Sequence, residues 1–171
     1  MAELTRADEG LAFLLQYENV AWYEDGAVRI LDRRVYPGKI SFVRCRTHGE
    51  VAQAIRDMVT QSAGPYTAAA MGMALAAHEC RDRDAAGQLA YLTGAADTLA
   101  HARPTTAARM ELVTAGCLAA AKTALAAGER ADEAIFRHAV ASNNARYRKV
   151  EKMAGYLVDF FPQNEIGRAH V

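Results

Sequence analysis

The strongest constraint in this sequence is a stretch of small residues between positions 65 and 80. Seven of the ten positions from 68 to 77 hold alanine or glycine, among them Ala68, Ala69, Ala70, Gly72, Ala74 and Ala76. Proline suits the first helical turn, so Pro65 predicts a helix from near that position to Ala77 or Cys80. Its side chains carry little bulk, and neighbouring elements can therefore approach it closely. The pattern predicts a buried helix at the centre of the domain.

The composition fits one compact domain with its own core. The chain has 171 residues, of which 51% are hydrophobic and 23% are charged. Its 20 basic and 20 acidic residues balance, and the basic ones are scattered among the acids. Nucleic-acid binding requires a basic excess on at least one face, so we expect no nucleic-acid partner. No apolar run reaches the roughly 18–20 residues of a membrane span. The polar, acidic start is unlike a secretory signal, so we expect no membrane partner.

The cysteines and histidines predict neither a disulfide framework nor a metal site. The three cysteines are Cys45, Cys80 and Cys117. They are odd in number, far apart and without CxxC spacing, which predicts buried or semi-exposed free thiols in a reducing, cytoplasmic compartment. The histidines considered as ligands are His48, His78, His101 and His138. Their spacing does not suit a metal, so we expect no metal ion and no cofactor.

The first third of the chain predicts a small antiparallel sheet. Residues 11–16 predict a short helix before it. Residues 19–23 and 27–31 predict two strands joined by a hairpin, because Asp25-Gly26 favours a tight turn. A further turn at Pro37-Gly38 leads to a third strand over residues 40–46. Trp22 and Tyr23 are interpreted as core or sheet-packing residues.

The rest of the chain predicts helices. A capping box over residues 47–50 (Thr-His-Gly-Glu) starts a helix that reaches about Thr60. After the break at residues 61–65 come the small-residue helix and further helices over about 84–101, from Thr105 or Thr106 to 127, and over about 131–160, where Pro162 ends the last. The predicted fold class is α+β, a three-stranded antiparallel sheet followed by a bundle of about five helices.

The order of these features resembles the amino-terminal domain of the S-methyl-5-thioribose-1-phosphate isomerase family. The similarity rests on residues 31–34 (Leu-Asp-Arg-Arg), Pro37, residues 54–59 (Ala-Ile-Arg-Asp-Met-Val), the small-residue helix and residues 103–105 (Arg-Pro-Thr). It covers about residues 17–161. The family also includes ribose-1,5-bisphosphate isomerases and regulatory subunits related to initiation factor 2B.

The resemblance implies a sugar-phosphate site at the break before the small-residue helix. In the isomerases this loop reads Arg-Gly-Ala-Pro and contacts the sugar phosphate. The corresponding candidate residues here are Gln61, Ser62, Ala63 and Gly64. Small residues leave backbone amides accessible at a helix N-terminus, which favours a phosphate. Gln61 replaces the family's arginine and adds no charge, which puts phosphate affinity or substrate choice in question. The alternative is a plain helix-breaking turn.

Arg103 is the second candidate, because it matches the arginine of the family's Arg-Pro-Thr motif. A guanidinium binds phosphate bidentately and stays charged at any working pH. The alternative is a solvated surface arginine. Thr105 or Thr106 is interpreted as a helix cap rather than a ligand. The polar residues 142–144 (Ser-Asn-Asn) on the last helix form either an exposed face or a buried polar layer, and the exposed face is favoured.

The resemblance also implies that the catalytic groups lie elsewhere. The isomerases use a cysteine and an aspartate in a carboxyl-terminal Rossmann-like domain, which would begin soon after the last helix. We therefore expect no catalytic residue in this chain and no activity of the chain alone. We also expect residues 1–165 to form the domain. Residues 166–171 (Ile-Gly-Arg-Ala-His-Val) can be encoded by the start of a common sequencing adapter, which predicts an artefact; a genuine polar tail or a cloning scar are the alternatives.

The leading functional hypothesis is a fragment of an aldose–ketose isomerase that acts on a sugar 1-phosphate in methionine salvage or a related pathway. The substrate would be S-methyl-5-thioribose 1-phosphate or a related 5-deoxypentose 1-phosphate, and the full-length protein a homodimer. The alternative is a non-catalytic regulatory subunit related to initiation factor 2B. A self-contained helical interaction module is disfavoured.

Overall fold

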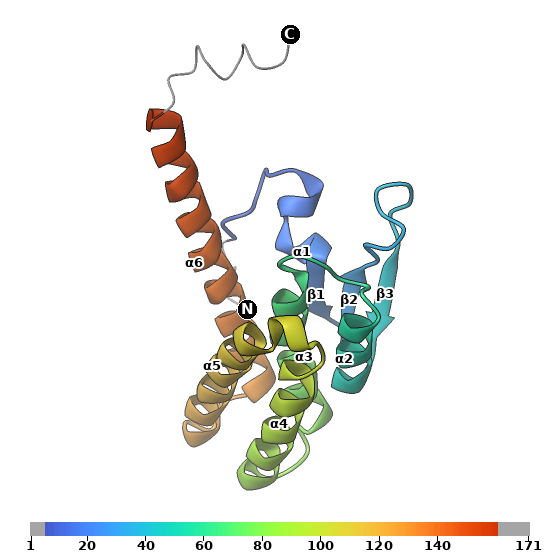
Figure 1. The fold of residues 1–171 in the computed structure, drawn as a ribbon. Helices are drawn as coiled ribbons and strands as arrows, with labels where there is room; N and C mark the ends of the chain where they lie inside the picture. Colours follow the sequence, from blue (N-terminus) through green and yellow to red (C-terminus); the bar gives the residue numbers. More distant parts are fainter. Residues whose placement is uncertain (1–5, 161–171) are drawn as a thin grey trace.

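The amino-terminal part of the chain forms a three-stranded antiparallel sheet in the order β1-β2-β3 (Figure 1). The computed structural model describes the backbone of residues 6–160 and the side chains of residues 6–149. The strands are β1 (Ala21–Glu24), β2 (Ala27–Leu31) and β3 (Phe42–Cys45). Asp25 and Gly26 join β1 to β2 with positive φ angles of 49° and 65°, as the predicted Asp-Gly turn requires.

The elements around the sheet differ from the prediction at their ends. The predicted early helix is reduced to one 3-10 turn, η1 (Phe13–Leu15), followed by α1 (Tyr17–Val20). The first strand therefore starts at Ala21 rather than at position 19. Asn19 is held in α1, where its side-chain amide donates to the carbonyl of Phe13. The third strand is shorter than predicted because Ile40 is 58% exposed and lies before the ladder.

Five longer helices follow the sheet and confirm the α+β class. They are α2 (His48–Arg56), α3 (Gly64–Glu79), α4 (Ala85–Ala100), α5 (Ala107–Ala126) and α6 (Ala131–Phe160), with a 3-10 turn, η2 (Pro104–Thr106), before α5. Helices α3 to α6 alternate in direction, so α3 and α5 begin at the same end of the bundle (Figure 1). Helix α6 packs on α3 and α5 and continues beyond them.

Helix α3 is the centre of the molecule, as its small residues predict. Thirteen of its 16 residues are buried. It contacts β1 and β2 on one side and α2, α4, α5 and α6 around the others. At Gly72 an added Cβ would lie 3.0 Å from Leu99 of α4 and 3.1 Å from Val51 of α2. The absence of a side chain there lets both neighbouring helices approach the backbone.

The helix caps are only partly as predicted. At the start of α2 the Glu50 amide donates to Thr47 Oγ1 at 3.1 Å, but the Glu50 carboxylate accepts from the Arg46 amide rather than from that of Thr47. Helix α2 also ends at Arg56, four residues before the predicted end. Met58 adopts a left-handed conformation with φ of 59°, and the Val59 amide then donates to the carbonyl of Ala54.

The polar residues 142–144 in the middle of α6 do not form the exposed face that the sequence favoured. Ser142 is exposed, but Asn143 is buried and Asn144 is half-buried. The Asn144 side-chain oxygen accepts from the Tyr17 hydroxyl at 2.9 Å and from the Ala7 amide at 2.8 Å. The amino-terminal segment covers this part of α6, a contact that the helix's own periodicity does not encode.

The cysteines are buried and free, which confirms that part of the prediction. Burial raises the pKa of the Cys45 thiol to about 11 and that of Cys117 to about 12.

Trp22 and Tyr23 pack against the core, also as predicted. Within the described residues, no helix is long and apolar enough to cross a membrane. The end of α6 at Pro162 and the expected tail of residues 166–171 lie outside the described residues.

Candidate phosphate site at one end of the bundle

The predicted phosphate loop, residues 61–64, is a tight turn that leads into α3. Ser62 is exposed and left-handed with φ of 57°, whereas Gln61 and Ala63 are half-buried. The turn is closed by the Gly64 amide, which donates to the carbonyl of Gln61 at 2.9 Å. The backbone break before α3 is therefore confirmed, and Gln61 and Ser62 reach the surface beside the helix start.

The loop offers few free backbone donors. The Gly64 amide is used within the turn, Pro65 has no amide hydrogen, and the Thr67 amide donates to the carbonyl of Ala63. The Tyr66 amide is the one amide in the first turn of α3 that has no hydrogen-bond partner among the described residues. A phosphate at this helix start would therefore depend on side chains as well as on the backbone.

Gly64 is required at its position by a close neighbour. A Cβ added there would collide with Oγ1 of Thr60, and would also lie 3.1 Å from Thr60 Cβ. Thr60 is 1% exposed, and its hydroxyl has no hydrogen-bond partner among the described residues. The loop and the preceding residue are thus packed directly against each other.

Arg103 lies in the connection from α4 to α5, at the same end of the bundle as residues 61–64 (Figure 1). Its backbone is extended, its carbonyl accepts from the Thr106 amide at 3.2 Å, and its side chain is half-buried. Thr106 occupies the N-cap position of α5 as predicted, but its side chain makes no cap hydrogen bond. In the described part of the chain, no hydrogen bond or ion pair joins Arg103 to the loop.

Four further residues gather near the start of α3 that sequence reasoning did not select. Around the ring of Tyr66, the guanidinium carbon of Arg146 lies 4.9 Å and that of Arg109 lies 5.7 Å from the ring centroid. Together with Asn143 these side chains line a cavity of about 20 Å³. Arg146 and Asn143 lie in the polar centre of α6, which was noticed but interpreted as exposed. No motif or spacing in the sequence singled out Arg109.

This end of the bundle carries positive charge without matching carboxylates. Several arginines elsewhere are paired with carboxylates, as in Arg34 with Asp32 and Arg130 with Asp132. Within residues 6–149, no carboxylate lies within ion-pair distance of Arg103, Arg109 or Arg146. The amino-terminal ends of α3 and α5 add partial positive charge in the same place. The arrangement favours an anion although the net charge of the chain is zero.

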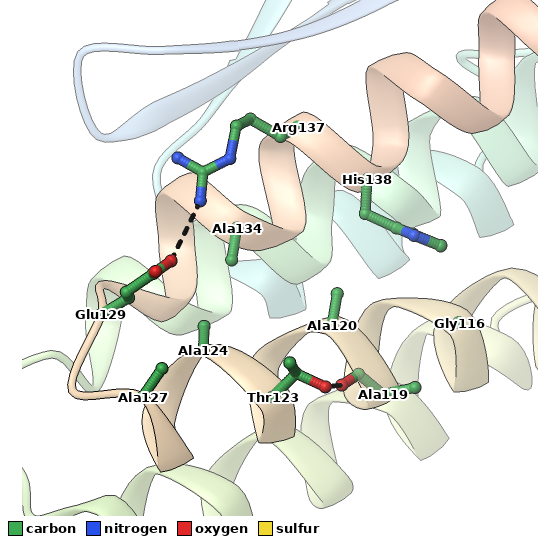
Figure 2. A pocket seen from close by; sticks show the side chains of 10 residues that line it. All are labelled: Gly116, Ala119, Ala120, Thr123, Ala124, Ala127, Glu129, Ala134, Arg137 and His138. Carbon is green, nitrogen blue, oxygen red and sulfur yellow. Dashed lines mark hydrogen bonds and ion pairs between the residues drawn. The ribbon is translucent and has the colours of Figure 1, made fainter.

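Figure 2 shows a different groove, of about 470 Å³, between α5 and α6. Alanines from both helices form much of its lining, and Arg137 and His138 project from α6. The Arg137 guanidinium lies 3.4 Å from the Glu129 carboxylate. His138 packs over Gly116, where a Cβ would lie 2.7 Å from its Nε2. The lining is small and apolar and its arginine is already paired, so this groove lacks the converging donors that a sugar phosphate needs.

Metal ligands do not gather in the described part of the chain: no group of three or more histidine, cysteine or acidic side chains is placed to hold an ion. The site chemistry there is that of guanidinium, amide and hydroxyl donors.

Comparisons with known proteins identify relatives of known activity. No family model matches the chain. It is 40% identical over 97 residues to methylthioribose-1-phosphate isomerase from Roseiflexus castenholzii, covering 54% of this chain and 27% of that protein. It is 38% identical over 87 residues to 5-deoxyribose 1-phosphate isomerase from Moorella thermoacetica, covering 50% of this chain and 24% of that protein. The chain thus spans about a quarter of the length of these relatives.

Solved structures share the fold. Subunit delta of the translation initiation factor eIF-2B from A. fulgidus has a TM-score of 0.57 and 28% identity, over 75% of this chain and 36% of that one. The 5-methylthioribose 1-phosphate isomerase from Pyrococcus horikoshii has a TM-score of 0.58 and 20% identity, over 75% and 35%. In sequence and fold the chain resembles the methylthioribose-1-phosphate isomerases and initiation factor 2B subunits, and its fold matches the amino-terminal part of theirs.

Proposed function

We propose that this chain forms the substrate-holding amino-terminal part of an aldose–ketose isomerase that acts on a sugar 1-phosphate. The observation that carries the proposal is the 40% identity to methylthioribose-1-phosphate isomerase over 97 residues. The position of Arg103 at the same end of the bundle as residues 61–64 supports it, because a guanidinium and a helix start can share one phosphate. The substrate would be S-methyl-5-thioribose 1-phosphate or a related 5-deoxypentose 1-phosphate.

In this proposal the chain binds and orients the substrate but does not perform the chemistry. Moving a hydrogen between adjacent sugar carbons needs acid–base groups held against the substrate in a site that excludes water. The three thiols are buried in the core, and burial raises the pKa of Cys45 and of Cys117. These thiols are therefore poorly suited to that role. A further part of the protein would supply the catalytic pair, and the full-length protein would act as a cytoplasmic homodimer.

Gln61 sets this chain apart from the isomerase pattern. An amide can donate to a phosphate oxygen but adds no charge, so it binds the dianion less strongly than an arginine. Arg103 would then supply most of the charge at the loop. The same substitution, with the 28% identity to the initiation factor subunit, favours a second candidate: a non-catalytic regulatory subunit that retains the domain.

Titration of the purified chain with S-methyl-5-thioribose 1-phosphate tests the binding role. Arg103→Ala should weaken binding at least about tenfold, or about 1.4 kcal/mol. Arg44→Ala, at an exposed arginine on β3, is the matched control and should bind like the unchanged protein. A change below tenfold in Arg103→Ala would make that arginine a bystander.

An isomerase assay separates the two candidates. The chain alone should show no turnover, and detectable turnover would contradict the assignment of the chemistry to another part of the protein. When a protein that contains this domain together with its carboxyl-terminal continuation is assayed, conversion of the sugar 1-phosphate supports the enzyme. Binding without conversion supports the regulatory subunit.

A further inference from the structure

A small pocket between α3, α5 and α6 has the features of a second ligand site. Its polar lining is made by Tyr66, Arg109, Asn143 and Arg146, and we refer to it as the Tyr66 pocket. Neither Arg103 nor any of residues 61–64 lines this pocket. We propose that the Tyr66 pocket binds a tetrahedral oxyanion, either free phosphate or a phosphate monoester, independently of the proposed sugar-phosphate loop.

The first argument is an unsatisfied donor. Asn143 is 5% exposed, and its side-chain nitrogen is buried without a hydrogen-bond partner among the described residues. Leaving a buried amide donor unpaired is unfavourable, so native proteins rarely retain one without an occupant or a function. Because Asn143 lines the pocket, an acceptor atom placed there would remove this cost.

The second argument is the charge around that donor. Arg146 lies against the rings of Tyr66 and Tyr147, at 4.9 Å and 5.5 Å from their centroids, and its Nη2 is 3.4 Å from Thr67 Oγ1. The guanidinium carbon of Arg109 lies 5.7 Å from the centroid of the same Tyr66 ring. Both guanidinium groups are thus held by aromatic and hydroxyl contacts instead of by carboxylates. The pocket presents two cations and an amide donor, and this combination recognises an oxyanion.

The size of the pocket indicates how such a ligand would sit. A volume of about 20 Å³ holds one water-sized atom. One oxygen of the anion would enter and accept from Asn143, while the other oxygens would stay at the rim beside the two guanidinium groups. Arg109 and Ser142 are exposed, so the rim can be reached from solvent. A tetrahedral anion with one inserted oxygen suits this shape better than a planar carboxylate that presents two.

Thermal unfolding in the presence of phosphate tests the proposal. A ligand that binds only the folded state raises the unfolding temperature, and the rise grows with the logarithm of one plus the ratio of ligand concentration to Kd. Potassium phosphate, compared with potassium chloride at equal ionic strength, should stabilise the chain. Titrations should give a dissociation constant that is at least about tenfold higher in Arg109→Met and in Asn143→Leu. Arg148→Met, at an exposed arginine on the same helix, is the matched control and should retain the phosphate effect.

The variants separate this pocket from the loop. Arg109 is exposed, so Arg109→Met should fold normally and provides the test even where Asn143→Leu disturbs the core. Equal stabilisation of the unchanged chain and of Arg109→Met, or no phosphate effect at all, would overturn the proposal. Loss of the effect in Arg103→Ala alone would move the anion to residues 61–64, which overturns this inference and leaves the proposed function standing. Methyl phosphate in place of phosphate distinguishes the two ligand forms: binding of the ester supports a phosphorylated metabolite, and binding of phosphate alone supports the free ion.

Discussion

Gly64 and Gly94 are two helical glycines with opposite surroundings. At Gly64 a Cβ would collide with Thr60 Oγ1, whereas at Gly94, on the exposed side of α4, nothing lies within 4 Å of an added Cβ. Neither residue has a positive φ, so alanine is conformationally allowed at both. The difference between them is therefore one of space alone.

Gly64→Ala should lower the free energy of unfolding by about 1–3 kcal/mol, as overpacking of a tight site does. Gly94→Ala should raise it by about 0.5–1 kcal/mol, because alanine favours the helix over glycine. Urea denaturation measures both. Adding Thr60→Ala to Gly64→Ala removes the colliding hydroxyl and should recover part of the loss. If the two glycine variants have the same stability, the collision with Thr60 is not real.

At the residue scale the sequence predicts the site only in part. Residues 61–64 and Arg103 were selected because they correspond to the isomerase family's phosphate loop and Arg-Pro-Thr motif, and each stands beside a proline, Pro65 or Pro104. The Tyr66 pocket could not, because its lining residues come from α3, α5 and α6 and meet only after those helices pack. Asn143 illustrates the reason. Burial of a polar residue depends on what covers its helix, and that information lies in a different segment.

A half-buried carboxylate joins three elements at the far end of α3. The Glu79 side chain accepts from the His48 amide at 2.6 Å and from the Tyr91 hydroxyl at 2.6 Å, and it lies 2.7 Å from His48 Nδ1. Burial by itself would raise the pKa of Glu79, but these hydrogen bonds outweigh it and the pKa is lowered from 4.5. The carboxylate thus connects the start of α2, the end of α3 and the middle of α4.

Replacing Glu79 should change how stability depends on pH. Because the folded-state pKa of Glu79 lies below its unfolded value of 4.5, its contribution is complete above that pH and is lost as pH falls through the folded pKa. In Glu79→Gln the free energy of unfolding should be lower near pH 7 and should fall less steeply below pH 4.5. Chemical denaturation between pH 3 and 7 measures the slope. Tyr91→Phe removes one hydrogen bond and should give an intermediate slope; an unchanged acid slope in Glu79→Gln would contradict the prediction.

Most helix bounds were predicted to within two residues, and the end of α2 is the main exception. Asp84 caps α4 by accepting from the Gly87 amide at 2.8 Å, and Thr47 caps α2, both at positions where the sequence carries a capping residue. The end of α2 was missed because a methionine takes the left-handed conformation that glycine usually provides. Thr106 has the sequence of a cap, but η2 occupies the position where α5 would otherwise have begun.

The sheet and the bundle form one body because α3 contacts both. A second connection runs through Trp22 of β1, whose ring lies 5.0 Å from that of Phe136 on α6 in an edge-to-face arrangement. Trp22 is the one tryptophan of the chain. Its fluorescence therefore reports the contact between the sheet and the last helix, while far-ultraviolet circular dichroism reports the helices together.

The chain should unfold in a single cooperative transition. Trp22 fluorescence and helical circular dichroism should give the same midpoint in urea, because α3 cannot lose the sheet without exposing its own apolar surface. Phe136→Leu should shift both midpoints together and by the same amount. Two separated transitions would show that the sheet and the bundle are independent units.

The overall architecture was predicted because strand patterns, capping residues and small residues occur along the sequence in the same order as the elements of the fold. The α+β class, the hairpin and the central place of α3 all follow from local patterns. The contact of the amino-terminal segment with α6 does not, since Tyr17 and Asn144 are more than a hundred positions apart and neither belongs to a periodic pattern. Long-range polar contacts of this kind required the structure.

The position of α3 also has a consequence for synthesis on the ribosome. The sheet and α2, which precede α3 in the chain, cover one flank of it as soon as it emerges. Its other sides face α4, α5 and α6, which are made later, with α6 the last of them. At about 5–20 residues per second, several seconds pass before α6 follows. During that interval α3, an apolar helix with no polar face, is only partly covered. The nascent chain therefore depends on chaperones most between the synthesis of α3 and that of α6.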